Sequence, residues 1–306
     1  MTAPILVSAY PASPAHAHWD PVLEGELLPA LCALPGVAGL EVPWTGGLHP
    51  HDEDWFLAHV PAVPLAVTSI PFVMGRVGAD PRYGLASSDE EGRAAAVADL
   101  RRVAADVARL EDESAASVAV VTLHTAPRAT GAVDALARSL REVAALDWRG
   151  ARLVIEHCDA FVPGRVPEKG FLPLDDEIAA IRTAGVPIGL WLNWGRSAIE
   201  LRDADAVTAQ VASAAASGLL VGLAFSGAAA MQNPYGPPWA DAHLPIASTH
   251  PESASLLDDA HVAAALAAAG DIEWWGLKAA RRPDDTSAAD AVRTVARNLA
   301  VVRAAG

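Results

Sequence analysis

The sequence predicts an α/β fold: an eight-stranded parallel barrel covered by helices, in one domain that spans residues 1–306. Eight short apolar runs rich in Val, Ile and Leu alternate with helical patterns. The runs lack strict alternation of apolar and polar residues, which is typical of strands covered on both faces. Several of them end in a polar or charged residue, as strands do where they emerge at the rim of a barrel.

The element order favours a closed (β/α)8 TIM barrel over an open, doubly wound sheet. Strands are expected at 4–10, 37–42, 64–70, 117–124, 151–157, 186–193, 219–226 and 272–278. Helices are expected near 20–33, 88–112, 130–146, 173–184, 203–217, 253–269 and 285–304, with a weakly marked one near 51–59. No G-x-G-x-x-G follows the first strand, so a dinucleotide-binding fold loses its main support.

Local signals mark helix starts and two long loops. Ser87–Glu90, Asp203 and Thr286 or Ser287 are expected N-terminal caps. The segments 71–87 and 227–252 are expected to be long loops that follow a strand. Such loops lie over the catalytic rim of a barrel, so the second one is expected to act as a semi-rigid lid.

Composition limits the partners. The net charge is −15, which argues against nucleic acid or an anionic membrane surface as partner. Two cysteines in 306 residues do not make a disulfide scaffold. The N-terminal segment lacks a basic region before its short apolar run, and no apolar run reaches the roughly 20 residues that span a bilayer. We therefore expect a cytoplasmic protein without a membrane segment.

Glu156 is the first candidate for catalysis, because it ends the apolar run of the fifth strand. A carboxylate at a barrel rim can ligate a metal, act as general base or bind a sugar hydroxyl, and a solvated strand end is the alternative. His157 is expected to point to the other side of the strand, where it either supports the structure or touches substrate.

Lys278 is the second candidate and ends the eighth strand. A lysine there can pair with Glu156, stabilise an enolate oxygen or form a Schiff base. The alternative is a lysine whose ammonium extends to solvent. We expect the Glu156 carboxylate and the Lys278 ammonium to face a shared hollow.

Further candidates end other strands or lie in the loops. Asn193 can donate to an oxyanion or a hydroxyl, and His124 can act as acid or base. Asp241 and His243 can share a metal or form an acid–base pair, and Cys158 beside Glu156 is expected to be a small buried residue. Asp241 and His243 are also candidates to bind substrate, together with the remaining candidates: Glu41, Trp44, Arg76, Trp194, Arg196, Ser226 and Trp239.

Taken together, these motifs resemble the xylose isomerase-like barrels. The resemblance rests on G-L-E and V-I-E at the ends of the second and fifth strands. The motifs E-H-C-D-A, N-W-G-R-S-A-I-E, F-S-G and W-x-D-x-H are similar to an uncharacterised bacterial branch of that superfamily. The superfamily includes sugar isomerases, 3-epimerases, inosose-handling enzymes and endonuclease IV-type repair enzymes, and the resemblance covers the whole chain as architecture.

The resemblance implies one divalent ion held at the ends of strands five to eight, and this chain departs from that pattern. Glu156 matches the strand-five glutamate. Asn193, Ser226 and Lys278 stand where an acid, a histidine and a glutamate are usual. An ammonium repels a nearby divalent cation. We therefore expect the metal to be absent, and the alternative is a rebuilt site whose candidate ligands are Glu156, Asp241 and His243.

The leading hypothesis is a sugar or sugar-acid isomerase or epimerase that works by proton transfer. Glu156 would be the base or hydroxyl anchor, Lys278 would stabilise the oxyanion, and Asn193 and His124 would orient the substrate. Stacking surfaces would come from Trp44, Trp194 and Trp239, and Arg76 or Arg196 would hold an acidic group.

Three alternatives stay open. Glu156 with Asp241 or Glu41 would make the carboxylate pair of a glycoside hydrolase. Lys278 as a Schiff base would make a lyase. A barrel that has lost its metal would bind a ligand without catalysis. In each case the expected partner is a small carbohydrate or sugar acid, and a homo-oligomer is allowed.

Overall fold

A computed structural model of the chain describes residues 3–16 and 18–306. Its eight strands form a closed parallel barrel in sequence order, as the sequence predicts. The strands are β1 (Ile5–Ser8), β2 (Val37–Pro43), β3 (Pro64–Thr68), β4 (Ser117–Leu123), β5 (Arg152–Glu156), β6 (Gly189–Asn193), β7 (Leu220–Phe225) and β8 (Trp274–Leu277).

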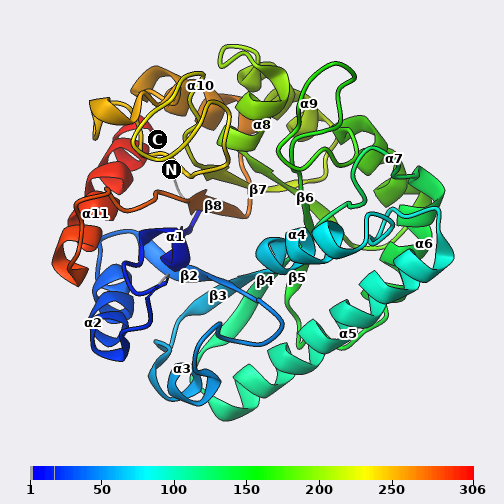
Figure 1. The fold of residues 1–306 in the computed structure, drawn as a ribbon, viewed down its shortest axis with the longest axis horizontal. Helices are drawn as coiled ribbons and strands as arrows, with labels where there is room; N and C mark the ends of the chain where they lie inside the picture. The colour runs from blue at the N-terminus through cyan, green and yellow to red at the C-terminus, as the bar shows by residue number, and fades with distance from the viewer. Residues whose placement is uncertain (1–2, 17) are drawn as a thin grey trace. The chain divides into compact units, whose positions relative to one another are not determined.

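Helices follow or precede each strand along the chain (Figure 1). They are α1 (Ala9–Ala12), α2 (Pro21–Cys32), α3 (Glu53–His59), α4 (Ile70–Ala79), α5 (Glu90–Glu113), α6 (Val133–Ala144), α7 (Leu174–Ala184), α8 (Trp194–Leu201), α9 (Val207–Ala216), α10 (Asp259–Ala269) and α11 (Ala288–Ala305). No helix in the described part of the chain is both long enough and apolar enough to cross a membrane.

The chain divides into two compact units. The first unit comprises Met1–Val42 and Leu192–Gly306, and the second unit comprises Pro43–Trp191. Both divisions fall inside strands, β2 and β6, so neither of them is a linker.

In the first unit, β1 lies between β2 and β8. Ser8 is paired with Glu41 and Val7 with Leu277. On the other side of β8, Phe225 of β7 is paired with Leu277. Outside these strands α2 packs against α11, α11 against α10, and α10 against α9 (Figure 1). The register therefore brings the carboxyl ends of β7, β8, β1 and β2 to one edge of the unit.

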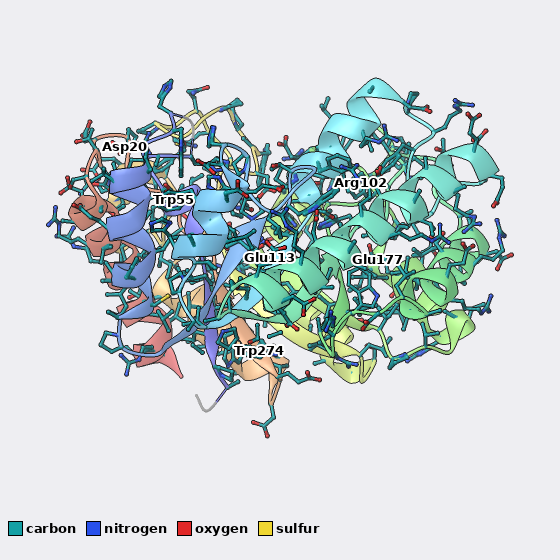
Figure 2. The ribbon with its side chains drawn as sticks, turned by 90° about the horizontal axis from the view of Figure 1, so that it is seen from below. Asp20, Trp55, Arg102, Glu113, Glu177 and Trp274 are labelled. Atoms are coloured by element: carbon teal, nitrogen blue, oxygen red, sulfur yellow. The ribbon has the colours of Figure 1, made fainter. Side chains whose placement is uncertain are left out.

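In the second unit, β4 pairs with β3 on one side and with β5 on the other. The long helix α5 packs against α6, and α6 against α7 (Figure 1). The amphipathic pattern of α5 explains its place, because its apolar residues face the sheet while charged residues such as Arg102 and Glu113 lie on the outside (Figure 2).

Helix starts follow ordinary capping chemistry. Asp20, labelled in Figure 2, accepts hydrogen bonds from the backbone N–H groups of Val22 and Leu23 at 3.0 and 3.1 Å. Asp89 and Ser287 cap α5 and α11, as the sequence predicts. The expected start at Asp203 is wrong: α9 begins at Val207 after a turn.

One predicted loop needs correction, and one helix was not predicted. The segment 71–87 contains the helix α4, whose first turn holds Pro71, a position where proline fits because its missing N–H has no helical partner. The sequence also missed α8, which follows β6 without a connecting loop. The segment 227–252 is irregular, as expected, and ends in a short 3-10 helix at Pro251–Ser253.

Candidate functional site

A buried ion pair lies at the strand ends of the first unit. The Nζ of Lys278 lies 2.6 Å from Oε1 of Glu41, and Ser8 Oγ donates a hydrogen bond to Oε2 of the same carboxylate. Ser8 ends β1, Glu41 lies near the end of β2, and Lys278 directly follows β8; the sheet register places these three strands side by side. All three are at most 5% exposed.

A main-chain hydrogen bond holds Lys278 in place. The backbone N–H of Lys278 donates to the carbonyl of Phe225 at 2.9 Å, so Lys278 continues the register of β8 with β7. A buried ammonium needs a compensating charge, and the Glu41 carboxylate supplies it. The arrangement gives the first unit a fixed positive group at the carboxyl end of its strands.

A second polar network follows β7. Ser226 Oγ lies 3.0 Å from Nδ1 of His243, and Asp241 Oδ1 lies 3.4 Å from the same nitrogen. The other carboxylate oxygen of Asp241 accepts from Nε of Arg196 at 2.9 Å. Arg196 is 1% exposed, so this pair is also buried. The expected pairing of Asp241 with His243 is therefore present, and Ser226 and Arg196 join it.

Asn193 offers a hydrogen-bond donor at the end of β6. Its Oδ1 accepts from the backbone N–H of Arg196 at 3.3 Å, which caps α8. Its Nδ2 is fully buried and has no hydrogen-bond partner among the described residues. A buried amide without a partner is costly, and a ligand oxygen or an ordered water satisfies it.

Two of the three tryptophans expected to stack on a sugar, Trp44 and Trp194, are buried. Trp44 is 1% exposed, and its Nε1 donates to Asp106 of α5 at 2.7 Å. Trp194 is fully buried edge-on to His261 of α10. Both rings pack into the helix layer. Trp239 is half-buried, with the guanidinium of Arg202 at 4.6 Å over its ring.

In the second unit, His124 is held at the end of β4. Its Nε2 lies 3.3 Å from Thr122 Oγ1, which donates to Thr68 Oγ1 at 3.1 Å. Its Nδ1 lies 4.0 Å from Cys158 Sγ. Cys158 is fully buried, as expected.

Glu156 ends β5, is 1% exposed, and is followed by a histidine that faces the helix layer. His157 Nδ1 lies 2.8 Å from Oε2 of Glu177 in α7, and Thr125 Oγ1 donates to Oε1 of Glu177 at 2.7 Å. This buried network ties the ends of β4 and β5 to α7. It favours the structural role of His157 over the substrate contact that the sequence also allowed.

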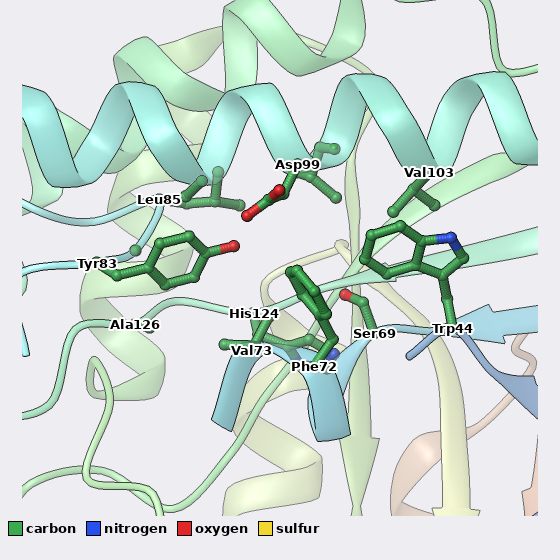
Figure 3. A pocket seen from close by; sticks show the side chains of 13 residues that line it. Trp44, Ser69, Phe72, Val73, Tyr83, Leu85, Asp99, Val103, His124 and Ala126 are labelled. Carbon is green, nitrogen blue, oxygen red and sulfur yellow. The ribbon is translucent and has the colours of Figure 1, made fainter. Parts of the chain in front are cut away.

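A small cavity lies beside His124 (Figure 3). It has room for about one water molecule, with a volume of about 20 Å³, and α4 and α5 contribute to its lining. Tyr83 points toward Asp99 in this cavity, and burial together with that carboxylate raises the pKa of the Tyr83 phenol. Arg76 pairs with Asp99 at 3.2 Å, so a carboxylate of the protein already binds the arginine expected to hold an acidic substrate group.

The residues present do not fit the divalent ion of the resembled superfamily. The ends of β6, β7 and β8 bear an amide, a hydroxyl and a buried ammonium, at Asn193, Ser226 and Lys278. Asp241, a candidate ligand, is bound to Arg196. Within the described residues no three His, Cys, Asp or Glu side chains are grouped for a metal. We derive no step through a metal.

Three site residues were not predicted from the sequence: Ser8, Glu177 and Tyr10, whose Oη lies 3.4 Å from Nε2 of His243. Ser8 and Tyr10 fall inside the strand expected at 4–10. The observed strand β1 ends at Ser8, so Tyr10 lies beyond it. Glu177 lies in a helical pattern and looks like a solvated charge. Glu156 and Lys278 belong to different units, and the predicted pairing between them stays a prediction.

The comparison with protein families decides the membership of the chain. The model of a domain of unknown function, DUF4862, matches residues 6–294. The chain belongs to the DUF4862 family. It is also similar to a Salmonella typhimurium protein, "Uncharacterized protein STM3670", with 37% identity over 281 residues, which cover 89% of this chain and 88% of that protein.

Solved structures share the fold of this DUF4862 member at low identity. An L-ribulose 3-epimerase has a TM-score of 0.63 at 16% identity, covering 99% of this chain and 96% of its own. The IOLI protein with a bound zinc atom has a TM-score of 0.64 at 13% identity, covering 99% of each chain. D-psicose 3-epimerase from Clostridium cellulolyticum H10, solved with D-tagatose, has a TM-score of 0.60 at 13% identity and the same coverage. The chain thus shares its barrel fold with these solved structures.

Proposed function

We propose that this DUF4862 protein is an enzyme that isomerises or epimerises a sugar by proton transfer at the carboxyl-terminal rim of its barrel. The observation that carries the proposal is the buried pair of Lys278, which directly follows β8, and Glu41, which lies near the end of β2; the two are 2.6 Å apart. The fold shared with sugar epimerases supports the substrate class by analogy.

The proposed chemistry needs a fixed positive charge. Removing the proton next to a sugar carbonyl moves negative charge onto the carbonyl oxygen. A preorganised ammonium in a site of low dielectric constant stabilises that oxygen in the transition state. Glu41 and Ser8 hold Lys278 in place, and Asn193 Nδ2 is the second donor for the same oxygen or a neighbouring hydroxyl.

Glu156 is the proposed base, because its carboxylate ends β5 and is buried. A carboxylate removed from water can accept a proton from carbon without competition from bulk solvent. His124, held by Thr122, is proposed to orient the substrate from the end of β4. No bond other than those to the transferred protons breaks in this scheme.

The charges favour an uncharged sugar over a sugar acid. Arg196 is bound by Asp241 and Arg76 by Asp99. An acidic substrate would have to compete with these carboxylates for either guanidinium. The hydrolase alternative also loses support, because Glu41 and Asp241, its second carboxylates, are each bound by a cation. A cytoplasmic location belongs to the same proposal.

The test is a panel of unphosphorylated aldoses and ketoses incubated with the purified protein, with products resolved by NMR. We expect one sugar pair to interconvert, and Glu156→Gln and Lys278→Met each to lower kcat by at least about 100-fold. Normal turnover in both variants would contradict the proposed roles. No interconversion across the panel would contradict the proposed reaction.

A further inference from the structure

The phenol of Tyr10 lies beside the His243 network of the first unit. Tyr10 follows β1 directly, in α1, and its Oη lies 3.4 Å from Nε2 of His243. The two rings meet edge to face, with their centroids 6.1 Å apart. Tyr10 is half-buried, whereas His243 is 8% exposed. The phenol is thus the more accessible end of a chain of polar groups.

Main-chain hydrogen bonds hold both ends of this contact to the segment after β8. The N–H of Ala280 donates to the carbonyl of His243 at 2.7 Å, and the N–H of Arg281 donates to the carbonyl of Pro11 at 3.0 Å. His243 has a φ of +53°, a left-handed conformation that is unfavourable for a residue with a Cβ. The surroundings therefore impose the position of the imidazole.

The Asp241 carboxylate beside His243 favours one of the two positions for the imidazole proton. Nδ1 faces Ser226 Oγ at 3.0 Å and the Asp241 carboxylate at 3.4 Å; the hydroxyl can accept or donate a hydrogen bond, whereas the carboxylate only accepts. This favours the tautomer protonated at Nδ1. Nε2 is then the acceptor for the Tyr10 hydroxyl. Asp241 is held in turn by the Nε of Arg196, so its carboxylate cannot turn away without breaking a buried pair.

We infer that Tyr10, His243 and Asp241 form a proton relay in which Tyr10 is a catalytic acid–base that exchanges a proton with a substrate hydroxyl. The inference rests on the proposed function and adds a residue to it. As the substrate O–H bond breaks, its proton passes to Tyr10 Oη and the proton of Tyr10 passes to Nε2 of His243. Asp241 balances the charge of the imidazolium. The same atoms return the proton to the product oxygen.

The kinetic test compares Tyr10→Phe with Tyr235→Phe. Both remove one hydroxyl from the first unit, but the Tyr235 hydroxyl has no hydrogen-bond partner in the described part of the chain. On the sugar that the wild type turns over, we expect Tyr10→Phe to lower kcat about 100-fold with KM changed less than about threefold. We expect Tyr235→Phe to match the wild type. Equal kcat in the wild type and Tyr10→Phe would overturn the relay.

A second measurement needs no substrate and separates failure of the relay from failure of the proposed function. ¹⁵N-histidine NMR reports the protonation of each imidazole nitrogen, and His243→Gln assigns the signals of His243. In a mildly alkaline buffer we expect Nδ1 protonated and Nε2 unprotonated, with the Nε2 shift displaced in Tyr10→Phe. A protonated Nε2, or an Nε2 chemical shift that is the same in the wild type and in Tyr10→Phe, would overturn the relay even if the wild type turns over sugars.

Discussion

The Lys278 ammonium is a buried charge at the strand ends of the first unit. A lysine ammonium that is 1% exposed loses most of its hydration, at a cost of several kcal/mol. The Glu41 carboxylate at 2.6 Å offsets that cost, and Ser8 satisfies the other oxygen of the carboxylate. Since the ammonium has almost no exposed surface, we expect substrate to reach it only when the side chains that cover it move apart.

We expect the contributions of Glu41 and Lys278 to the free energy of unfolding to be strongly coupled. Glu41→Gln leaves the Lys278 ammonium buried without its counter-charge and should cost about 3–5 kcal/mol of unfolding free energy. Lys278→Met should cost a similar amount. The double variant should cost clearly less than the sum, as measured by urea unfolding at neutral pH.

The control for this cycle is Arg82→Met, which breaks exposed pairs with Asp80 at 3.1 Å, Asp89 at 3.6 Å and Glu91 at 3.7 Å. We expect no measurable change there, because solvent screens exposed pairs. Strictly additive costs for Glu41→Gln and Lys278→Met would contradict the coupling.

His250 gives a pH-dependent prediction. Burial, helped by the positive charge of Arg282, lowers the pKa of His250 below its ordinary value of 6.5, although Glu252 acts in the opposite direction. The unfolded chain therefore binds more protons than the folded one in the window just below pH 6.5. We expect the unfolding free energy to fall as the pH is lowered through that window.

The measurement is urea unfolding at several pH values for the wild type and His250→Gln. In the variant, the unfolding free energy should depend less steeply on pH, because the contribution of His250 is absent while the contributions of other groups remain. A slope that is identical in both proteins would show that His250 is not the group responsible.

At the residue scale, the sequence identified most rim residues but not their partners. Glu41 and Lys278 both end apolar runs, which marks them as rim residues. They are 237 positions apart, and only the register of β1 with β2 and β8 shows that they meet. Tryptophans were harder to place, because an indole fits a helix–sheet contact as well as a sugar face, and Trp44 and Trp194 both pack toward helices.

At the element scale, α8 depends on a glycine. A Cβ at Gly195 would lie 2.6 Å from the carbonyl oxygen of Ser226 and 3.2 Å from that of Gly227. These are backbone atoms and cannot swing aside. Gly195 therefore lets the first turn of α8, with its cap Asn193, approach the chain that follows β7.

We expect Gly195→Ala to destabilise the protein by about 1–3 kcal/mol, because the added methyl overpacks a tight backbone contact. Gly75→Ala in α4 is the matched control. A Cβ there meets nothing within 4 Å, and alanine is the better helix former by about 1 kcal/mol. In thermal unfolding, we expect the midpoint temperature of Gly195→Ala to lie below that of the wild type and the midpoint temperature of Gly75→Ala to lie above it. A neutral Gly195→Ala would contradict the close approach.

The elements that the sequence missed have a common cause. Helix α4 begins with Ile70-Pro71 and contains Gly75 and Gly78, residues that usually mark loops. Helix α8 has eight residues and starts directly at the end of β6, so its helical period is too short to stand out beside the strand. Long helices such as α5 and α11 were predicted to within a few residues, because their apolar stripes repeat over several turns.

At the scale of the whole molecule, eight apolar runs separated by helical patterns were enough to predict a closed parallel barrel in sequence order. Chain connectivity explains this, because each strand–helix–strand unit places the next strand beside the last with one handedness. The chemistry was not predicted to the same depth. It depends on which strand-end residues face one another, and pairings such as Lys278 with Glu41 are set by register and not by spacing along the chain.

The central claim is that this barrel moves a proton on and off a sugar carbon. The most direct measurement is mass spectrometry of sugars incubated with the protein in D2O. We expect one sugar to gain a single carbon-bound deuterium with the wild type, and Lys278→Met to slow this at least about 100-fold. Sugars that stay unlabelled with the wild type, or labelling that continues unchanged in Lys278→Met, would contradict it.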